Sequence, residues 1–310
     1  MNTETSDDMK KVTVVGSSNT DMVVKSGRLP LPGETIVGDS FLMNAGGKGA
    51  NQAVAIARLG IPTTFVARIG NDMFGQESKV IFENEGINVK YVCTDEENPS
   101  GVALITVDEH GENSIVVAAG ANAKLSVDDI EMATKEIESS NYLLMQLEIP
   151  MQAVEAAANI AHTSGVKIVL NPAPAQYISC DLLEKLYIIT PNRGEAELLT
   201  GIKILDIETA KEAAMEIIRK GVQNVIITLG SIGSLVCENG EFTLVEAFKV
   251  EAIDTTAAGD TFNGALCVGL TEGMTLIEAV VFASKAAAIA VTRMGAQSSI
   301  PTRDEICTFK

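Results

Sequence analysis

The chain of 310 residues has no tryptophan, four tyrosines and only two histidines. His110 lies in a polar turn segment and His162 in an alanine-rich helical segment. We interpret both as structural or solvated, which disfavours mechanisms built on a histidine base. The scarcity of aromatic side chains also leaves little on which the bases of a single-stranded nucleic acid could stack.

Basic side chains are scarce as well. The chain has 23 lysines and arginines against 41 acidic residues, and its formal net charge is -18. This excludes nucleic acids and anionic membranes as main partners, because phosphate groups on such surfaces require clustered positive charge. A mononucleotide remains possible, since backbone amides and a metal ion can supply positive potential.

Cysteines are few and far apart: Cys93, Cys180, Cys237, Cys267 and Cys307. Their odd number and the lack of a Cys-x-x-Cys pair predict reduced, mostly buried thiols rather than disulfides or a zinc site.

Long apolar runs are also missing. The N-terminal stretch MNTETSDDMKK lacks the apolar core of a signal peptide, and the most apolar late stretch, residues 276–292, carries Glu278 and Lys285. We expect a buried helix there and a soluble cytoplasmic protein. The length and the hydrophobic content of 46% suffice for a large α/β core.

Apolar β-type runs alternate with helical patterns along most of the chain. The expected strands are residues 12–15, 64–69, 143–147, 167–170, 187–190 and 225–229. The expected helices between them include residues 51–59, 74–85, 151–164 and 210–220. This alternation predicts an α/β fold, a doubly wound and mostly parallel sheet sandwiched by helices, in a single domain spanning residues 1–310.

Two segments break the alternation. Residues 22–43 are β-like but contain Pro30, Pro32 and Gly33, and residues 100–119 read as a hairpin around Gly111. Having no helices of their own, these segments predict a small second sheet, which we interpret as a lid.

Polar residues recur where the expected strands end. Asn19 and Asp21 follow the first strand, and later strand ends are followed by Glu148, Asn171, Asn192 with Glu195, and residues 228–233. Ligands of open α/β sheets bind beyond the carboxyl ends of the strands. A single such residue is usually a turn or cap, but the repetition favours a site.

Residues 254–264, DTTAAGDTFNG, read as a loop of small residues entering a helix. Free amides and the positive end of the helix dipole make such a terminus suitable for an anion. Asp260 would repel a phosphate unless it accepts a proton from an attacking hydroxyl. On this segment alone, the interpretation of Asp260 as a plain N-cap is the better supported one.

Two further segments allow a structural or a functional interpretation. Gly46 and Gly47 form either a plain turn before a helix or a junction between lid and body whose backbone touches a sugar. Residues 44–51 lack the Ser or Thr of a common phosphate loop, and residues 16–19 lack a dinucleotide fingerprint. Asn192 and Glu195 either open a helix or act near phosphate and Mg²⁺.

Together these motifs resemble the ribokinase (PfkB-type) family of carbohydrate kinases over nearly the whole length. The resemblance is carried by AGGKGANQAVAIARLG (residues 45–60) and DTTAAGDTFNGAL (residues 254–266), with support from GSSNTD, QLEIP, NPAPA, TPNRGEAELLTG and TRMGAQSSIP.

The resemblance implies a role for each matching residue. Asp260 would be the catalytic base, and the amides of Ala257, Ala258 and Gly259 the anion hole. The sugar would be held by Asn19, Asp21, Gly47, Lys48, Asn51, Glu148 and Asp260. The ATP site would be lined by Asn192, Thr228, Leu229, Gly230, Ser231, Ile232, Gly233, Gly259 and Ser284. Glu195 would act on Mg²⁺ through water. Asp254 and Thr256, with backbone groups near Ala290, Arg293, Gly295 and Ser299, would surround a K⁺ ion.

The implied reaction is transfer of phosphate from MgATP to the 5-hydroxyl of D-ribose, by a homodimer formed through the lid. Sibling kinases that act on deoxyribose, fructose or a nucleoside are the alternatives. A non-catalytic sugar-binding regulator is an alternative of a different class, disfavoured because Asp260, Gly259 and Glu195 are all present. Ser284 is smaller than expected near an adenine, which leaves the nucleotide preference open.

Overall fold

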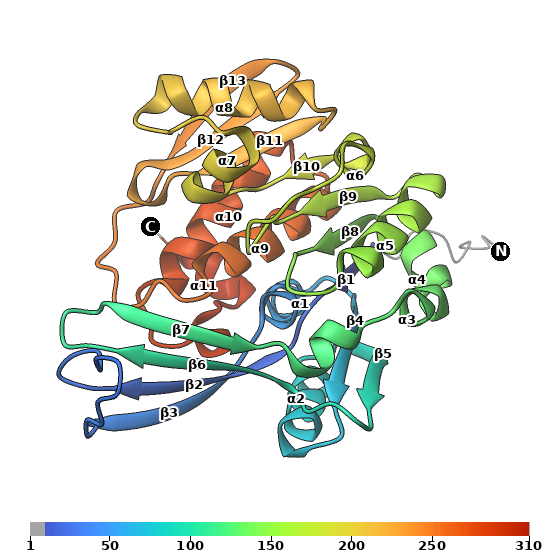
Figure 1. The fold of residues 1–310 in the computed structure, drawn as a ribbon. Helices are drawn as coiled ribbons and strands as arrows, with labels where there is room; N and C mark the ends of the chain where they lie inside the picture. The colour runs from blue at the N-terminus through green and yellow to red at the C-terminus, as the bar shows by residue number, and fades with distance from the viewer. Residues whose placement is uncertain (1–9, 310) are drawn as a thin grey trace.

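The computed structural model describes residues 10–309 and folds them around two β-sheets (Figure 1). Most of the polar N-terminal stretch therefore lies outside the described residues. The large sheet contains β1 (Val12–Val15), β4 (Thr63–Gly70), β5 (Asn88–Asp95), β8 (Tyr142–Met145), β9 (Lys167–Leu170), β10 (Ile188–Ile189), β11 (Asn224–Thr228), β12 (Gly233–Glu238) and β13 (Glu241–Glu246). The small sheet contains β2 (Asn19–Lys25), β3 (Ser40–Gly46), β6 (Gly101–Val107) and β7 (Asn113–Ala118).

The helices connect and cover these strands. The α-helices are α1 (Lys48–Arg58), α2 (Met73–Asn84), α3 (Val127–Met132), α4 (Thr134–Glu138), α5 (Met151–Thr163), α6 (Cys180–Lys185), α7 (Arg193–Thr200), α8 (Ile207–Arg219), α9 (Ala258–Glu272), α10 (Leu276–Ala290) and α11 (Arg303–Thr308). Short 3-10 helices are η1 (Gly120–Lys124), η2 (Gly230–Ile232) and η3 (Gln297–Ser299). None of the helices in the described part of the chain is long and apolar enough to cross a membrane.

The large sheet has the strand order β13-β12-β11-β10-β9-β8-β1-β4-β5. Its strands pair in parallel from β5 to β11, and β12 and β13 continue it antiparallel. The predicted mostly parallel sheet is confirmed. The antiparallel edge and β5 were missing from the expected strands.

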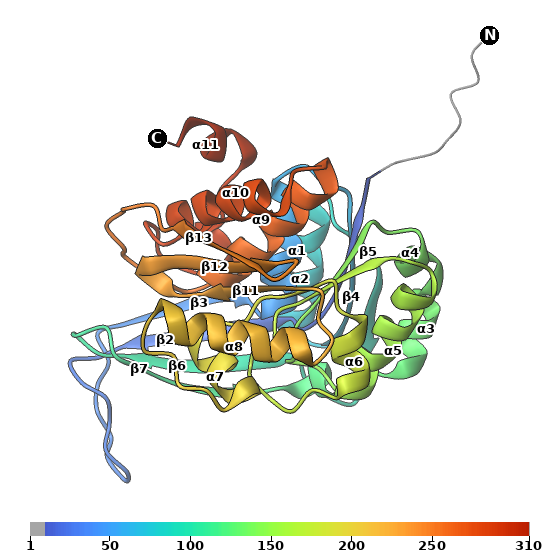
Figure 2. The same cartoon turned by 90° about the horizontal axis from the view of Figure 1, so that it is seen from above.

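Helices cover both faces of this sheet, as Figures 1 and 2 show. Successive strand residues point to opposite faces, so Val14 and Leu144 pack in one apolar core while Val15 and Leu143 pack in the other. The first core includes residues of α1, α2, α9, α10 and α11, and the second includes residues of α3 to α8. The sheet is therefore doubly wound, as predicted.

The order in which successive strands are added to the large sheet reverses at β1. It first adds β4 and β5 on one side of β1 and later adds β8 to β11 on the other. A crevice forms beyond the carboxyl ends of the strands at such a switch point, here β1 and β8. The connection after β1 leads into β2, and the one after β8 contains Gln146 and Glu148.

The small sheet has the order β3-β2-β6-β7 and extends away from the large one (Figure 2). The predicted hairpin is confirmed, since β6 and β7 pair antiparallel. The first segment is longer than expected, because β2 begins at Asn19 and β3 ends at Gly46. Asn19 and Asp21 thus belong to the small sheet itself and not to a loop that follows β1.

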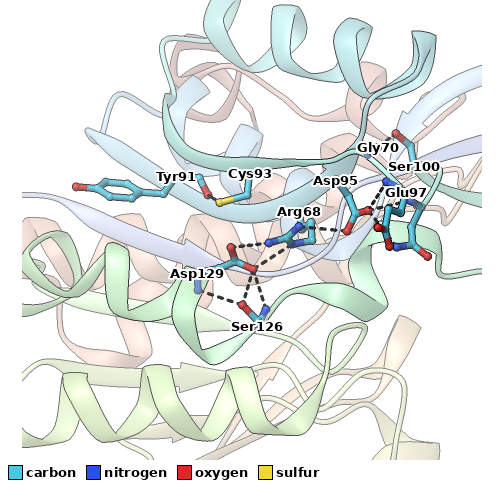
Figure 3. A network of polar contacts seen from close by, with 10 residues as sticks. Arg68, Gly70, Tyr91, Cys93, Asp95, Glu97, Ser100, Ser126 and Asp129 are labelled. Atoms are coloured by element: carbon cyan, nitrogen blue, oxygen red, sulfur yellow. Dashed lines mark hydrogen bonds and ion pairs between the residues drawn. The ribbon is translucent and has the colours of Figure 1, made fainter.

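A partly buried cluster around Arg68 joins the start of β6 in the small sheet to β4 and β5 of the large one (Figure 3). Arg68 on β4 donates through Nη2 and Nε to the two carboxylate oxygens of Asp129 on α3, at 2.8 and 3.0 Å, and through Nη1 to Asp95 at 3.1 Å. Asp95 in turn accepts from the backbone amide of Asn98 at 2.8 Å, and Ser100 Oγ accepts from the amide of Gly70 at 3.0 Å. These bonds hold the segment that leads from β5 into β6.

The cysteines lie apart, without a disulfide in residues 10–309. The expectation of mostly buried thiols is only partly confirmed. Cys237 and Cys267 are buried and Cys93 is half-buried, but Cys180 and Cys307 are exposed because they lie on short surface helices.

Candidate active site

Asp260 lies in the first turn of α9 and is buried, with 6% of its surface exposed. The helix is capped by Ala257, which adopts a left-handed conformation with φ 58°, and no side chain caps it. The carboxylate of Asp260 instead accepts from Asn51 Nδ2 and Gln52 Nε2 of α1, both at 2.9 Å. The interpretation of Asp260 as a plain N-cap is therefore wrong.

The amides at the start of α9 form a site suited to an anion. The amides of Gly259 and Asp260 have no acceptor among residues 10–309. A Cβ atom built on Gly259 would meet nothing within 4 Å, so a ligand has room to approach. One expectation changes: the amide of Ala258 is already bonded to the carbonyl oxygen of Thr255 at 3.2 Å.

Glu148 lies at the junction of β3 and α1, where it contacts Lys48 and the segment that follows β1. Glu148 Oε2 accepts from Ser17 Oγ at 2.5 Å and from the backbone amide of Lys48 at 3.1 Å. Gly47 precedes the helix with φ 90°, and a Cβ atom there would lie 2.6 Å from the amide nitrogen of Asn19. Only glycine allows this close approach of the two backbones. Gly47 is thus a turn before a helix, at the junction of β3 and α1, and its contact with a sugar stays a prediction.

Asn19 is held by Asn122, which was not among the expected site residues. Asn122 Nδ2 donates to Asn19 Oδ1 at 2.8 Å and to the carbonyl oxygen of Ser18 at 3.0 Å, and its Oδ1 accepts from the amide of Ser18 at 2.8 Å. With its oxygen occupied, Asn19 presents its NH₂ group as a donor.

Asn51 has a free acceptor beside Asp260. Its Nδ2 is bonded to the Asp260 carboxylate, but its Oδ1 is buried and has no partner within the described range. An unsatisfied buried acceptor is costly, and a ligand hydroxyl would satisfy it.

The charges at this site influence one another. Burial alone would lower the pKa of the Lys48 ammonium, but the surrounding carboxylates outweigh burial and raise that pKa above its ordinary value. These carboxylates belong to Asp260, Glu148, Glu195 and Asp21. Burial, reinforced by Glu148 and Asp260, raises the pKa of Asp21 to about 6. Burial also raises the pKa of Glu195.

Replacing Asp21 by asparagine is expected to stabilise the protein more at pH 7.5 than at pH 5. The folded state keeps the Asp21 proton up to about pH 6, whereas the unfolded chain releases it near about pH 4. The carboxylate therefore destabilises the fold increasingly as the pH rises from 4 to 6, by roughly 3 kcal/mol above pH 6. Urea unfolding of Asp21→Asn at both pH values measures this.

The control for this experiment is Asp39→Asn, at an exposed position in the connection from β2 to β3. It should change the free energy of unfolding by less than about 0.5 kcal/mol at either pH. An equal gain for Asp21→Asn at both pH values would contradict the shifted titration.

Asn192 and Glu195 form a capping box at the start of α7. Glu195 Oε2 accepts from the amide of Asn192 at 2.8 Å, and Asn192 Oδ1 accepts from the amide of Glu195 at 2.9 Å. The helix-start interpretation is thus confirmed. A parallel bridge joins Asn192 to Thr228, which brings the 228–233 segment beside it. Ser284 is half-buried on α10.

Asp254 links two loops that were expected to surround a cation. Its Oδ1 accepts from the amide and hydroxyl of Thr256 at 2.9 and 2.6 Å, and its Oδ2 accepts from the amide of Gly295 at 2.9 Å. Burial opposes ionisation, but these hydrogen bonds outweigh it and lower the pKa of Asp254. Ser299 is buried in η3. The side chain of Arg293 pairs with Glu305 at 2.5 Å, so only its backbone is available for the expected cation.

Comparison with known proteins agrees with this geometry. A model described as pfkB family carbohydrate kinase matches residues 9–303. The chain belongs to this family. A ribokinase of Haemophilus influenzae is 48% identical over 300 residues, which cover 97% of this chain and 98% of the relative.

Two further relatives of this carbohydrate kinase bear on its substrate. The structure of Arabidopsis thaliana ribokinase complexed with ribose and ATP matches with a TM-score of 0.88 and 34% identity, covering 97% of this chain and 98% of that one. A deoxyribokinase of Salmonella typhi is also 34% identical, covering 95% of this chain and 96% of the relative.

Three buried amide side chains near the site of this kinase were not predicted: Gln52 contacts Asp260, Asn122 contacts Asn19, and Gln146 contacts Gln52. Gln52 lies in an apolar stretch of α1, and Gln146 ends the apolar run of β8. A polar residue inside an apolar run was the available signal, since such a group must find a partner when buried.

Proposed function

We propose that this protein is a ribokinase, which transfers the γ-phosphoryl group of ATP to the 5-hydroxyl of D-ribose. The observation that carries the proposal is the position of Asp260. Its carboxylate is buried beside the unpaired amides of Gly259 and Asp260 and next to the free acceptor of Asn51. A proton acceptor, an anion site and a hydroxyl-binding group therefore meet at one point.

In the proposed reaction, Asp260 accepts the proton of the sugar hydroxyl while that oxygen bonds to the γ-phosphorus. The bond between the γ-phosphorus and the oxygen that bridges to the β-phosphate breaks. This oxygen keeps the bonding electron pair and leaves as part of ADP. Amides of Gly259 and Asp260 stabilise negative charge on the transferring group. Asp260 needs no strong basicity, because proton transfer is late in a loose transition state.

The site also suits Mg²⁺ bound together with ATP. Residues 10–309 hold no group of three or more histidine, cysteine, aspartate or glutamate side chains arranged for a metal ion. Mg²⁺ is commonly held by one or two carboxylates plus substrate phosphates, so such a group is not required. Glu195, whose charge acts on both Lys48 and Asp260, would hold it directly or through water. When bound, the ion would neutralise phosphate charge.

We also propose that a monovalent cation, with K⁺ as the expected one, binds between the loops around Asp254. Burial opposes ionisation of this carboxylate, but its hydrogen bonds and the charge of Lys25 lower its pKa and keep it charged. Its bond to Gly295 ties the loop before α9 to the segment that follows α10, between Ala290 at the end of that helix and Ser299 in η3. We infer that a cation held there by backbone oxygens would stiffen the anion site at Gly259.

For the nucleotide, we propose a site beside the start of α7 and residues 228–233. The bridge between Asn192 and Thr228 places both segments at the carboxyl ends of β10 and β11. Ser284 on α10 is assigned to the adenine side. The small sheet, we propose, closes over the sugar as a lid.

Ribose is favoured because Asn19, Asp21 and Glu148 offer polar partners for several hydroxyls. A buried group built to bond a hydroxyl rejects an analogue without it, since the group is left unpaired. Deoxyribose is therefore disfavoured, and the low aromatic content disfavours a nucleoside.

The deciding experiment measures ADP release with MgATP on ribose, deoxyribose, fructose and adenosine, each in K⁺ and in a buffer with a large organic cation instead. We expect kcat/KM for ribose to exceed that for deoxyribose at least about 100-fold, and to rise with K⁺. A preference for another sugar would assign the protein to a sibling kinase. Ribose binding without turnover would make it a sugar-binding regulator.

We further propose that the protein is a homodimer formed through the outer face of the small sheet. Cross-strand pairing places Val24 beside Phe41, and Leu104 beside Val116, on the face opposite Asp21. All four apolar side chains are exposed. Such a contiguous apolar patch indicates an interaction surface.

Sedimentation velocity tests the dimer. Leu104→Arg should shift the protein to a monomer at micromolar concentration, because the charge would be buried in the interface. The matched control Leu205→Arg, at an exposed leucine before α8, should remain dimeric. A monomeric native protein would contradict the proposal.

A cytoplasmic location is proposed as well. The five cysteines are unpaired, which is typical of a reducing compartment, and ATP is the expected phosphoryl donor. Cell fractionation followed by the kinase assay would place the activity.

A further inference from the structure

The side chain of Gln52 lies against Asp260 but has no assigned role. It is fully buried on α1. Its Nε2 donates to Asp260 Oδ1 at 2.9 Å and to Asn171 Oδ1 at 3.2 Å, and its Oε1 accepts from Gln146 Nε2 at 2.6 Å. Both polar atoms of the amide are thus used.

The orientation of this amide is determined by its partners. An ionised carboxylate can only accept, so Gln52 must turn its NH₂ group towards Asp260. Asn171 is oriented in the same way, because its Nδ2 donates at 3.2 Å to the backbone carbonyl of Thr190, which is also only an acceptor.

From Thr190 the hydrogen bonds return to the anion site. Thr190 Oγ1 donates to Asn263 Oδ1 at 2.6 Å, and Asn263 Nδ2 donates to the carbonyl oxygen of Gly259 at 2.8 Å. A closed ring therefore runs from Asp260 through Gln52, Asn171, Thr190 and Asn263 to Gly259. Its side chains are all buried.

The ring connects the start of α9 to the large sheet. Gln146 follows β8, Asn171 follows β9 and Thr190 follows β10. Since neighbouring strand ends are fixed by the sheet, the ring holds both the carboxylate and the Gly259 peptide in a set position relative to them.

We propose that Gln52 is a positioning residue for the catalytic base. It anchors Oδ1 of Asp260 to the sheet and leaves Oδ2, which is bonded to Asn51, as the oxygen that accepts the sugar proton. This inference rests on the proposed role of Asp260 as the base. A neutral amide suits the task, because it orients the carboxylate without the charge that would neutralise a base.

The test replaces Gln52 by methionine, which has a similar length but no donor. The lost hydrogen bond favours the ionised over the protonated carboxylate, so the acidic limb of kcat/KM should move upwards by about one pH unit. At pH 7 kcat should fall about tenfold or more, while KM for the sugar changes less than about threefold.

Gln146→Met is the matched control. Gln146 is equally buried and belongs to the same cluster, but it contacts Gln52 and not Asp260. The control should lose stability to a similar extent and keep the wild-type acidic limb. Asp21, Lys48 and Glu195, whose charges act on Asp260, remain in both variants. An equal acidic limb in Gln52→Met and Gln146→Met would overturn the proposal.

Gln52→Glu covers the case in which Gln52→Met does not fold. Glutamate has nearly the same shape, and its charge beside Asp260 should raise the acidic limb further; an unchanged limb would overturn the proposal. Carbon-13 NMR titration of the Asp260 carboxyl, assigned with Asp260→Asn, reads the same shift without turnover. The pH titrations therefore test the positioning role of Gln52, and the ADP-release assay tests the proposed kinase activity. Either proposal can fail while the other is upheld.

Discussion

Asp260→Asn is expected to lower kcat by about 10³-fold, within the range for removal of a general base, and to change the Kd for ribose less than about threefold. Asparagine keeps the shape of the side chain and can still bond to Asn51 or Gln52. It cannot take up the proton of the sugar hydroxyl. Stopped-flow or steady-state ADP release gives kcat, and calorimetry with ribose gives the affinity.

Glu278→Gln is the matched control for this substitution. Glu278 occupies the same third position of its helix, α10, that Asp260 occupies in α9, but it is part of a capping box with Thr275. The same acid-to-amide change there should leave kcat within about twofold. If Asp260→Asn retained more than a tenth of the wild-type kcat, Asp260 would not be the base.

The sequence predicted those elements best whose residues are mostly buried. Strands β1 and β9 match their expected bounds, because a short apolar run of a parallel strand has clear ends. Helix α1 begins three residues earlier than expected, at Lys48. Its first turn contains Gly49, a poor helix former, so periodicity did not reveal it.

Side-chain partners across the fold were the least predictable feature. The residue types at strand ends indicated a site, and Asn171 was noticed there, but nothing local shows that Gln52 reaches it. The two are separated by 119 positions in the chain. Likewise the placement of Asn19 on the small sheet follows from pairing of β2 with β3 and β6, which a linear pattern does not contain.

Gly264→Ala is expected to destabilise the protein and to impair catalysis together. Gly264 lies where α9 crosses α1, and an added Cβ atom would be 2.5 Å from Ala55 Cβ and 3.0 Å from the carbonyl oxygen of Gln52. No flexible side-chain end can yield there, so the helices must move apart. Overpacking of this kind costs about 1–3 kcal/mol, which lowers Tm by several degrees and is measurable by calorimetry.

The effect on catalysis follows from what the two helices carry. Asn51 and Gln52 on α1 hold the carboxylate of Asp260 on α9, so a shift of a few tenths of an ångström between the helices disturbs both hydrogen bonds. We expect kcat to fall at least about tenfold. Gly194→Ala is the stability control, because a Cβ atom there meets only Asn192 Oδ1 at 3.6 Å and alanine favours a helix. If Gly264→Ala were as stable as Gly194→Ala, close packing of α1 on α9 would not be what holds the base in place.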